Sequence, residues 1–195
     1  IKMSDRRVVV TGIGALTPIG NNLKKYWSSL IAGVSGADLI THFDAKKFKT
    51  QFACELKGFD PSEHITKKEV RKLDKFSQYA MVVADEAFKD SGINADSINS
   101  ERAGVIWGSG IGGMETFFTE SVNYSKREGE PRFNPFFIPK LISDIPAGHI
   151  SIKYNLRGPN FTTVSACASS TNALIDAFNY IKWNKADFFV AGGSE

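Results

Sequence analysis

The sequence has little cysteine and no long apolar run, and its charges nearly balance. Its 195 residues include only two cysteines, Cys54 and Cys167, which lie far apart, form no disulfide framework and suit a reducing compartment. No apolar stretch reaches the length of a membrane-spanning helix, and no charged-then-apolar leader opens the chain. The formal net charge is only +3, so the overall charge does not indicate a nucleic-acid partner. These absences predict a cytoplasmic protein with neither a membrane nor a nucleic-acid partner.

Metal and nucleotide motifs are also missing. No histidine has metal-ligand spacing to another histidine or to a cysteine; the three are His42, His64 and His149. The turn Gly12-Ile13-Gly14 follows an apolar run, but a dinucleotide fingerprint needs a third glycine where this chain has Thr17 and then Pro18. We therefore expect no metal and interpret the glycines as a tight turn between a strand and a helix.

The remaining pattern alternates strands and helices. Apolar, β-branched runs predict strands at 7–11, 103–107, 161–164 and 187–190, and loops with short strands fill 34–63. Helical spacing predicts helices over 21–32, 67–90, 114–125, about 142–154 and 173–181. Strands separated by helices pair in parallel, so the sequence predicts a layered α/β domain.

Cys167 lies where a predicted strand meets a predicted helix. Residues that can begin a helix crowd this junction: Ser165, Ser169, Ser170 and Thr171. Unpaired backbone N–H groups and the positive end of a helix dipole favour a thiolate there, and the thiolate is the nucleophilic form. A free cysteine is more often inert packing, but this strand-to-helix context brings the catalytic and the packing interpretations near even.

Two other segments are candidates for function. The loop from Gly108 to Gly113 follows a buried strand, and its one large apolar residue, Ile111, can line an apolar cavity. A basic stripe falls at helical spacing on the predicted helix over 67–90, where its residues are Lys68, Arg71, Lys72 and Lys75. Such a stripe is usually a solvated face, but it can also steer an acidic partner.

Four blocks together identify a resemblance: VVVTGIGALTPIGNN, VIWGSGIGGMETF, NPFFIPKLISDIPAGHISIKYNLRGPNFTTVSACASS and DFFVAGGSE. They resemble the β-ketoacyl-acyl carrier protein synthases, and the synthase II type in particular. The resemblance implies a thiolase-like layered α/β/α/β/α fold in which each half supplies a mixed five-stranded sheet. It further implies that residues 3–195 form the N-terminal half. The C-terminal half, with two histidines, a lysine and a Gly-Phe-Gly-Gly loop, would then lie outside this chain.

The resemblance also implies roles for particular residues. Cys167 would be the nucleophile that takes an acyl group as a thioester before decarboxylative Claisen condensation with malonyl-acyl carrier protein in type II fatty acid elongation. The acyl pocket would be lined by Ile111 and, from the neighbouring subunit of a homodimer, by Phe137 and Phe136. Acyl carrier protein would contact Lys68, Arg71 and Lys72. No cofactor is expected, because the substrates ride on the phosphopantetheine arm of that partner.

Two departures from the family pattern leave the acyl length open. Asn172 stands where the family often has His, and Ile175 where it often has Gly, so Ile175 would reshape the acyl tunnel. One alternative is therefore a ketosynthase of a secondary lipid or polyene pathway. Another is a non-catalytic partner subunit that shapes chain length, which the presence of Cys167 disfavours. We expect this half alone to be inactive, since it lacks the histidines.

Overall fold

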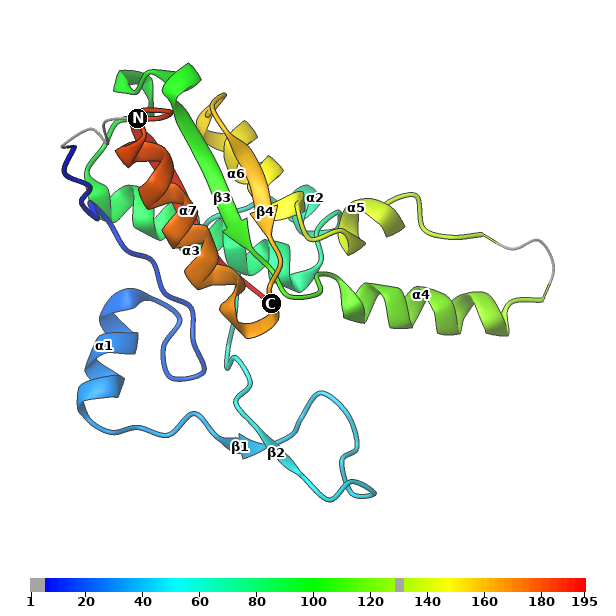
Figure 1. Cartoon of the computed structure of the whole chain (residues 1–195). Coiled ribbons are helices and arrows are strands. Elements are labelled where there is room, and N and C mark those ends of the chain that lie inside the picture. The colour runs from blue at the N-terminus through cyan, green and yellow to red at the C-terminus, as the bar shows by residue number, and fades with distance from the viewer. Residues whose placement is uncertain (1–5, 129–131) are drawn as a thin grey trace.

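A parallel three-stranded sheet forms the centre of the computed structural model, which describes residues 6–128 and 132–195. The strands are β3 (Ala103–Gly108), β4 (Asn160–Thr163) and β5 (Phe188–Gly193), in the order β4-β3-β5 (Figure 1). Gly108 aligns with Thr163 on one side and with Gly193 on the other, so the carboxyl ends of all three strands meet at one edge. The predicted parallel pairing is confirmed, and the segments after these strands are brought together.

Helices cover both faces of the sheet. α7 (Ser169–Lys182) packs on one face, while α3 (Lys75–Ser91) and α6 (Ile145–Tyr154) pack on the other (Figure 1). The other described helices are α1 (Leu23–Ile31), α2 (Lys67–Val70), α4 (Met114–Lys126), α5 (Phe137–Leu141), and the 3-10 turns η1 (Ala95–Ser97), η2 (Ser100–Arg102) and η3 (Ala166–Ala168). Apart from the helix predicted over 67–90, the predicted helices are confirmed to within a few residues.

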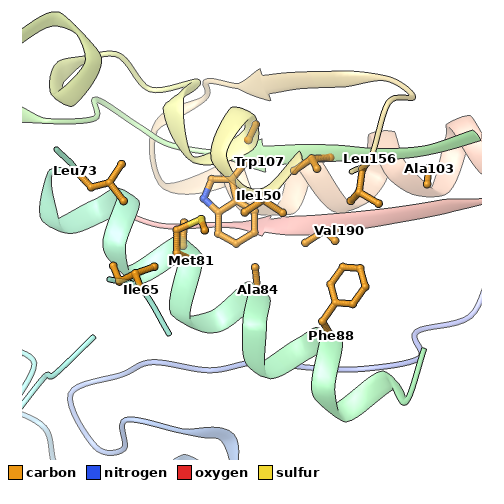
Figure 2. Packing of buried hydrophobic residues seen from close by; sticks show 13 residues of the cluster. Ile65, Leu73, Met81, Ala84, Phe88, Ala103, Trp107, Ile150, Leu156 and Val190 are labelled. Carbon is orange, nitrogen blue, oxygen red and sulfur yellow. The ribbon is translucent and has the colours of Figure 1, made fainter. Parts of the chain in front are cut away.

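The core follows from the alternation of side chains along β3. Val105 and Trp107 point towards α3 and α6, whereas Ile106 between them packs against α7. Figure 2 shows Met81, Ala84 and Phe88 of α3 facing Trp107, Ile150 of α6 and Val190 of β5. Because β3 is buried along its whole length, its sequence reads as a continuous apolar run.

The strand predicted at 7–11 is wrong: within the described residues this segment pairs with no strand. Side-chain hydrogen bonds hold the next residues against α3 instead, since the Ile13 N–H donates to Asp90 and the Ala15 N–H to Glu86. A Cβ at Gly14 would lie 2.0 Å from the carbonyl oxygen of Val83 on α3. Close approach to a helix therefore explains the glycines of this segment without a nucleotide.

The helix predicted over 67–90 is also wrong, because the structure divides it into α2 and α3. Leu73 turns inward between them and is only 3% exposed. The Gln78 side-chain amide donates to the carbonyls of Val70 and Leu73 at 3.3 and 3.0 Å, which satisfies groups that a helix end leaves unpaired. The apolar residues keep helical spacing across this break, so periodicity did not reveal it.

Two segments extend from the layered core. The short antiparallel pair β1 (Asp38–Leu39) and β2 (Phe52–Ala53) lies in the predicted loop region, and α4 projects away from the sheet (Figure 1). Across 6–128 and 132–195, no helix combines the length and the apolar character needed to cross a membrane.

Candidate active site

Cys167 lies in the single turn η3, which joins β4 to α7 at the carboxyl edge of the sheet. Its neighbour Ala166 has a φ of 50°, in the left-handed region that residues with a Cβ seldom adopt. Such strain tends to be kept where function requires it. The turn leaves Cys167 exposed to solvent. The predicted junction is confirmed, and buried inert packing does not describe this thiol.

The buried hydroxyl of Ser169 holds this turn in shape. Its Oγ accepts from the Ser165 N–H at 2.8 Å and donates to the Ala166 carbonyl at 2.7 Å. The Thr163 hydroxyl donates to the Ser169 carbonyl, and the Asn172 amide donates to the Ser165 hydroxyl at 2.6 Å. These serines therefore fix the turn across Cys167, although no side-chain hydrogen bond caps the start of α7.

The first turn of α7 follows η3 directly, so the positive end of the helix dipole faces the Cys167 turn. Stabilisation of the Cys167 thiolate by this dipole stays a prediction.

The glycine loop after β3 lies against the same turn. A Cβ at Gly108 would lie 2.4 Å from the backbone of Ser169 and Ser170, and one at Gly110 would lie 3.6 Å from the Cα of Ala166. The loop therefore carries Ile111, which is 61% exposed, close to the Cys167 turn. Ile175 is half-exposed on α7, two helical turns beyond Cys167.

Glu195 is a site residue that the sequence did not reveal. One carboxylate oxygen accepts from the Ser109 hydroxyl (3.1 Å) and the Gly110 N–H (2.7 Å). The other accepts from the N–H groups of Ile111 (2.9 Å) and Gly112 (3.2 Å). More than eighty residues separate these partners in sequence, and only the pairing of β3 with β5 brings them together.

Phe136 and Phe137 lie at the start of α5 rather than in the Cys167 turn. The Phe137 ring stacks on Phe133 and Phe117, with centroids 5.1 and 6.3 Å apart. The Gly113 N–H donates to the Leu141 carbonyl at 2.9 Å, which ties the glycine loop to the end of α5.

Three residues of the basic stripe, Lys68, Arg71 and Lys75, are exposed and Lys72 is half-buried, but the stripe does not keep its expected geometry. Lys68 lies on α2, Arg71 follows the end of that helix, and Lys72 lies in the turn before α3, so these residues do not share one helix face. The Lys72 ammonium lies 5.4 Å from the centroid of the Phe136 ring. Lys75 pairs with Glu115 of α4 at 3.0 Å, and this hydrogen bond raises the pKa of the lysine.

The histidines have separate environments. The His64 ring bonds to the Asp85 carboxylate at 2.7 Å, and His42 lies 3.8 Å from Glu55. Burial lowers the pKa of His149 in α6. In the part of the chain that the structure describes, no cluster of three or more His, Cys, Asp or Glu side chains could hold a metal ion.

The parallel sheet covered by helices on both faces, with an exposed cysteine at the amino end of a helix beside a glycine loop, matches about half of a thiolase-like ketosynthase fold. The chain belongs to the family described as the β-ketoacyl synthase N-terminal domain, which matches residues 5–195. The resemblance seen in the sequence is thereby confirmed.

Similar proteins agree with this assignment. The "3-oxoacyl-[acyl-carrier-protein] synthase 2" of Staphylococcus aureus (strain COL) is 44% identical over 191 residues, which cover 98% of this chain and 46% of that protein. The solved ishigamide ketosynthase/chain length factor superposes with a TM-score of 0.89 at 26% identity, over 98% of this chain and 48% of its own.

A second solved structure contains a type II PKS acyl-carrier protein in complex with its ketosynthase bound to the hexaketide. The matched chain has a TM-score of 0.82 at 26% identity, covering 98% of this chain and 51% of its own. The chain spans about half the length of the curated relatives it matches.

Proposed function

We propose that this chain is the nucleophile-bearing half of a β-ketoacyl-acyl carrier protein synthase that elongates fatty acids. The observation that carries the proposal is the exposed Cys167 on a strained turn at the amino end of α7, beside the glycine loop. The similarity to 3-oxoacyl-[acyl-carrier-protein] synthase 2 proteins supports the same reaction.

The proposed reaction has two bond exchanges at Cys167. Its thiolate attacks the thioester carbonyl of an acyl carrier protein, the pantetheine thiol leaves, and the acyl group stays on Cys167. Malonyl-acyl carrier protein then loses CO2, and its enolate carbon attacks the Cys167 thioester to form the new C–C bond and release the thiolate. The Cys167 N–H would be one oxyanion donor. The other donor, and the histidines that assist decarboxylation, would come from the second half of the protein.

The pocket and the subunit arrangement are parts of the same proposal. Ile111 and Ile175 would line the acyl pocket, because both expose apolar surface close to the nucleophile turn or along its helix. Phe136 and Phe137 would reach the pocket of a second copy in a homodimer. The protein would act in the cytoplasm, which the two free cysteines favour.

The labelling test compares the two exposed cysteines in the full-length protein. A chloroacetyl-pantetheine probe should label the wild type and the Cys54→Ala variant but not Cys167→Ala. The Cys167→Ala variant should also fail to condense acyl and malonyl carriers. Equal labelling and condensation by Cys167→Ala would exclude the proposed nucleophile.

The carrier protein is the proposed partner of the basic segment around α2. Lys68 and Arg71 are exposed, whereas the nearby Glu69 carboxylate is occupied by the backbone and hydroxyl of Thr66. Glu69 keeps its charge, but Lys67, Lys68 and Arg71 outnumber it, so the segment is positive and suits an acidic partner. The complex of a ketosynthase with its acyl-carrier protein among the matched structures supports this choice.

Charge reversal tests this surface. The double variant Lys68→Glu/Arg71→Glu should weaken carrier-protein association by about tenfold or more and reduce its salt dependence. Reaction with small thioesters should be unchanged. The control Lys46→Glu/Lys47→Glu changes the net charge equally in an exposed loop and should bind normally. Equal loss in both double variants would assign the effect to net charge rather than to a docking surface.

A ketosynthase of a secondary lipid pathway is the second candidate, favoured by Ile175 and by the polyketide ketosynthase among the matched structures. Competition between saturated and unsaturated acyl carriers of several lengths separates the two, since a fatty acid synthase should prefer saturated chains.

A further inference from the structure

The loop from Gly108 to Gly113 takes its shape from a carboxylate outside the loop. Four of its six residues are glycine, which restricts the backbone least, and Gly112 has a φ of 92°. Three consecutive N–H groups, those of Gly110, Ile111 and Gly112, all point at Glu195. Converging backbone N–H groups form an anion-binding nest, and here the anion is a side chain of the same protein.

The main chain just before Glu195 is bonded to β3, which fixes the position of the Glu195 carboxylate. The Ser194 N–H donates to the Gly108 carbonyl at 3.1 Å, and the Trp107 indole donates to the Ser194 hydroxyl at 3.0 Å. Trp107 is itself only 2% exposed. Glu195 is therefore held through β3 and β5, and its charge-assisted hydrogen bonds transmit that rigidity to the loop.

The loop in turn lies between the two parts of the proposed acyl site. Its Gly110 contacts the turn that carries Cys167, and its Gly113 is bonded to the end of α5. Ile111 lies between these contacts, and its own N–H is one of the groups that Glu195 binds at 2.9 Å. Because Glu195 binds the backbone N–H of Ile111 itself, a change at Glu195 should directly alter the position of the Ile111 side chain.

We propose that Glu195 is a positioning residue that sets which acyl chains are accepted, by fixing Ile111 beside Cys167. The proposal rests on the proposed ketosynthase function. Glu195 touches neither substrate nor the reacting sulfur in this scheme. It acts through the loop, so it should govern how well the pocket fits the acyl chain rather than the reactivity of the thiol.

Glu195→Gln in the full-length protein is the direct test. Its amide NH2 takes the place of one carboxylate oxygen and cannot accept, so either the bond from the Gly110 N–H or both bonds from the N–H groups of Ile111 and Gly112 are lost. We expect the ratio of kcat/KM for long-chain over short-chain acyl carrier protein to fall by about tenfold, because short chains do not need a wall at Ile111. Iodoacetamide alkylation of Cys167, measured in a Cys54→Ala background, should stay within about twofold of the wild-type rate.

Two further variants guard against misfolding. Ser109→Ala removes one donor to Glu195 and should shift the same ratio in the same direction by a smaller factor. Asp187→Asn is the matched control, since it neutralises a carboxylate at the opposite end of β5 that binds Arg6 and Arg102. It should lower the melting temperature and leave the acyl preference unchanged.

The outcomes are distinct. If Glu195→Gln leaves the ratio of kcat/KM for long-chain over short-chain acyl carrier protein unchanged, the positioning role is overturned. If Glu195→Gln does not fold, an unchanged ratio in Ser109→Ala overturns it instead. An equal loss for all acyl lengths, accompanied by slower alkylation, overturns it too, because it indicates damage to the nucleophile turn. Absence of any acyl-Cys167 in the wild type refutes the ketosynthase function itself.

Discussion

Replacement of Asp85 by Asn should destabilise the protein strongly, because this buried carboxylate joins α3 to the segments packed on it. Its side chain is 11% exposed and accepts hydrogen bonds from Lys153 (2.8 Å), His64 (2.7 Å) and the Tyr154 hydroxyl (2.8 Å). Lys89, one helical turn along α3, completes the set at 2.8 Å. Burial alone would raise the pKa of Asp85, but these partners outweigh it and hold the pKa well below its usual range.

The expected magnitude follows from the burial of the partners. Removing one member of a fully buried ion pair costs about 3–5 kcal/mol. The Lys89 side chain is 69% exposed and can return to water, and Asn keeps one acceptor oxygen for Tyr154. We therefore expect Asp85→Asn to lower the free energy of unfolding by about 2–3 kcal/mol at pH 7, once that exposure is discounted.

The pH dependence has a definite sign. A carboxylate with a lowered pKa in the folded state stabilises that state above its unfolded pKa of about 4, and this contribution is lost as the pH falls further. The gap between wild type and Asp85→Asn should therefore be full at pH 7 and shrink below about pH 4.

Urea unfolding followed by circular dichroism at several pH values measures this gap. Asp38→Asn is the control, because Asp38 forms an exposed ion pair with Lys57 and should contribute nothing measurable. A difference between wild type and Asp85→Asn that is constant from pH 7 to about pH 3 would refute the electrostatic reasoning and point to packing instead.

Two further predictions concern packing and the acyl site. Gly14→Ala should lower the free energy of unfolding by about 1–3 kcal/mol, because the added Cβ would meet the Val83 carbonyl. The control Gly148→Ala has open space in α6 and should be neutral or slightly stabilising. Thermal unfolding compares the two variants, and equal melting temperatures would contradict the close-approach argument. Ile175→Ala should extend the accepted acyl chains by a few carbons if Ile175 limits the tunnel. Product lengths by mass spectrometry decide this, and an unchanged distribution would remove Ile175 from the pocket wall.

Local patterns in the sequence were sufficient to predict a strand or helix wherever the spacing of its own apolar residues matches the face that it buries. The run at 103–107 is enclosed on both faces and was predicted as β3, and the Cys167 junction was placed between β4 and α7. The alternation of these elements also predicted parallel pairing.

The failures involve partners distant in the sequence. The run at 7–11 has the composition of a strand, but a strand also needs a neighbour to bond with, and no pattern within the run shows whether one exists. Within the described residues the sheet has three strands, not the five that the resemblance implied. Glu195 and Asp85 carried no local signal, because their hydrogen-bond partners come from other elements.

The shared carboxyl edge of the sheet has a practical consequence for engineering this protein. The Cys167 turn, the glycine loop and Glu195 all follow the strands at that edge, while Asp187 binds Arg6 and Arg102 at the opposite edge. Under the proposed ketosynthase function, libraries aimed at product length can therefore be confined to one end of the domain, and thermostabilising changes can be collected at the other. The six residues of β3 separate the two ends, so substitutions at one end should have little effect on the other.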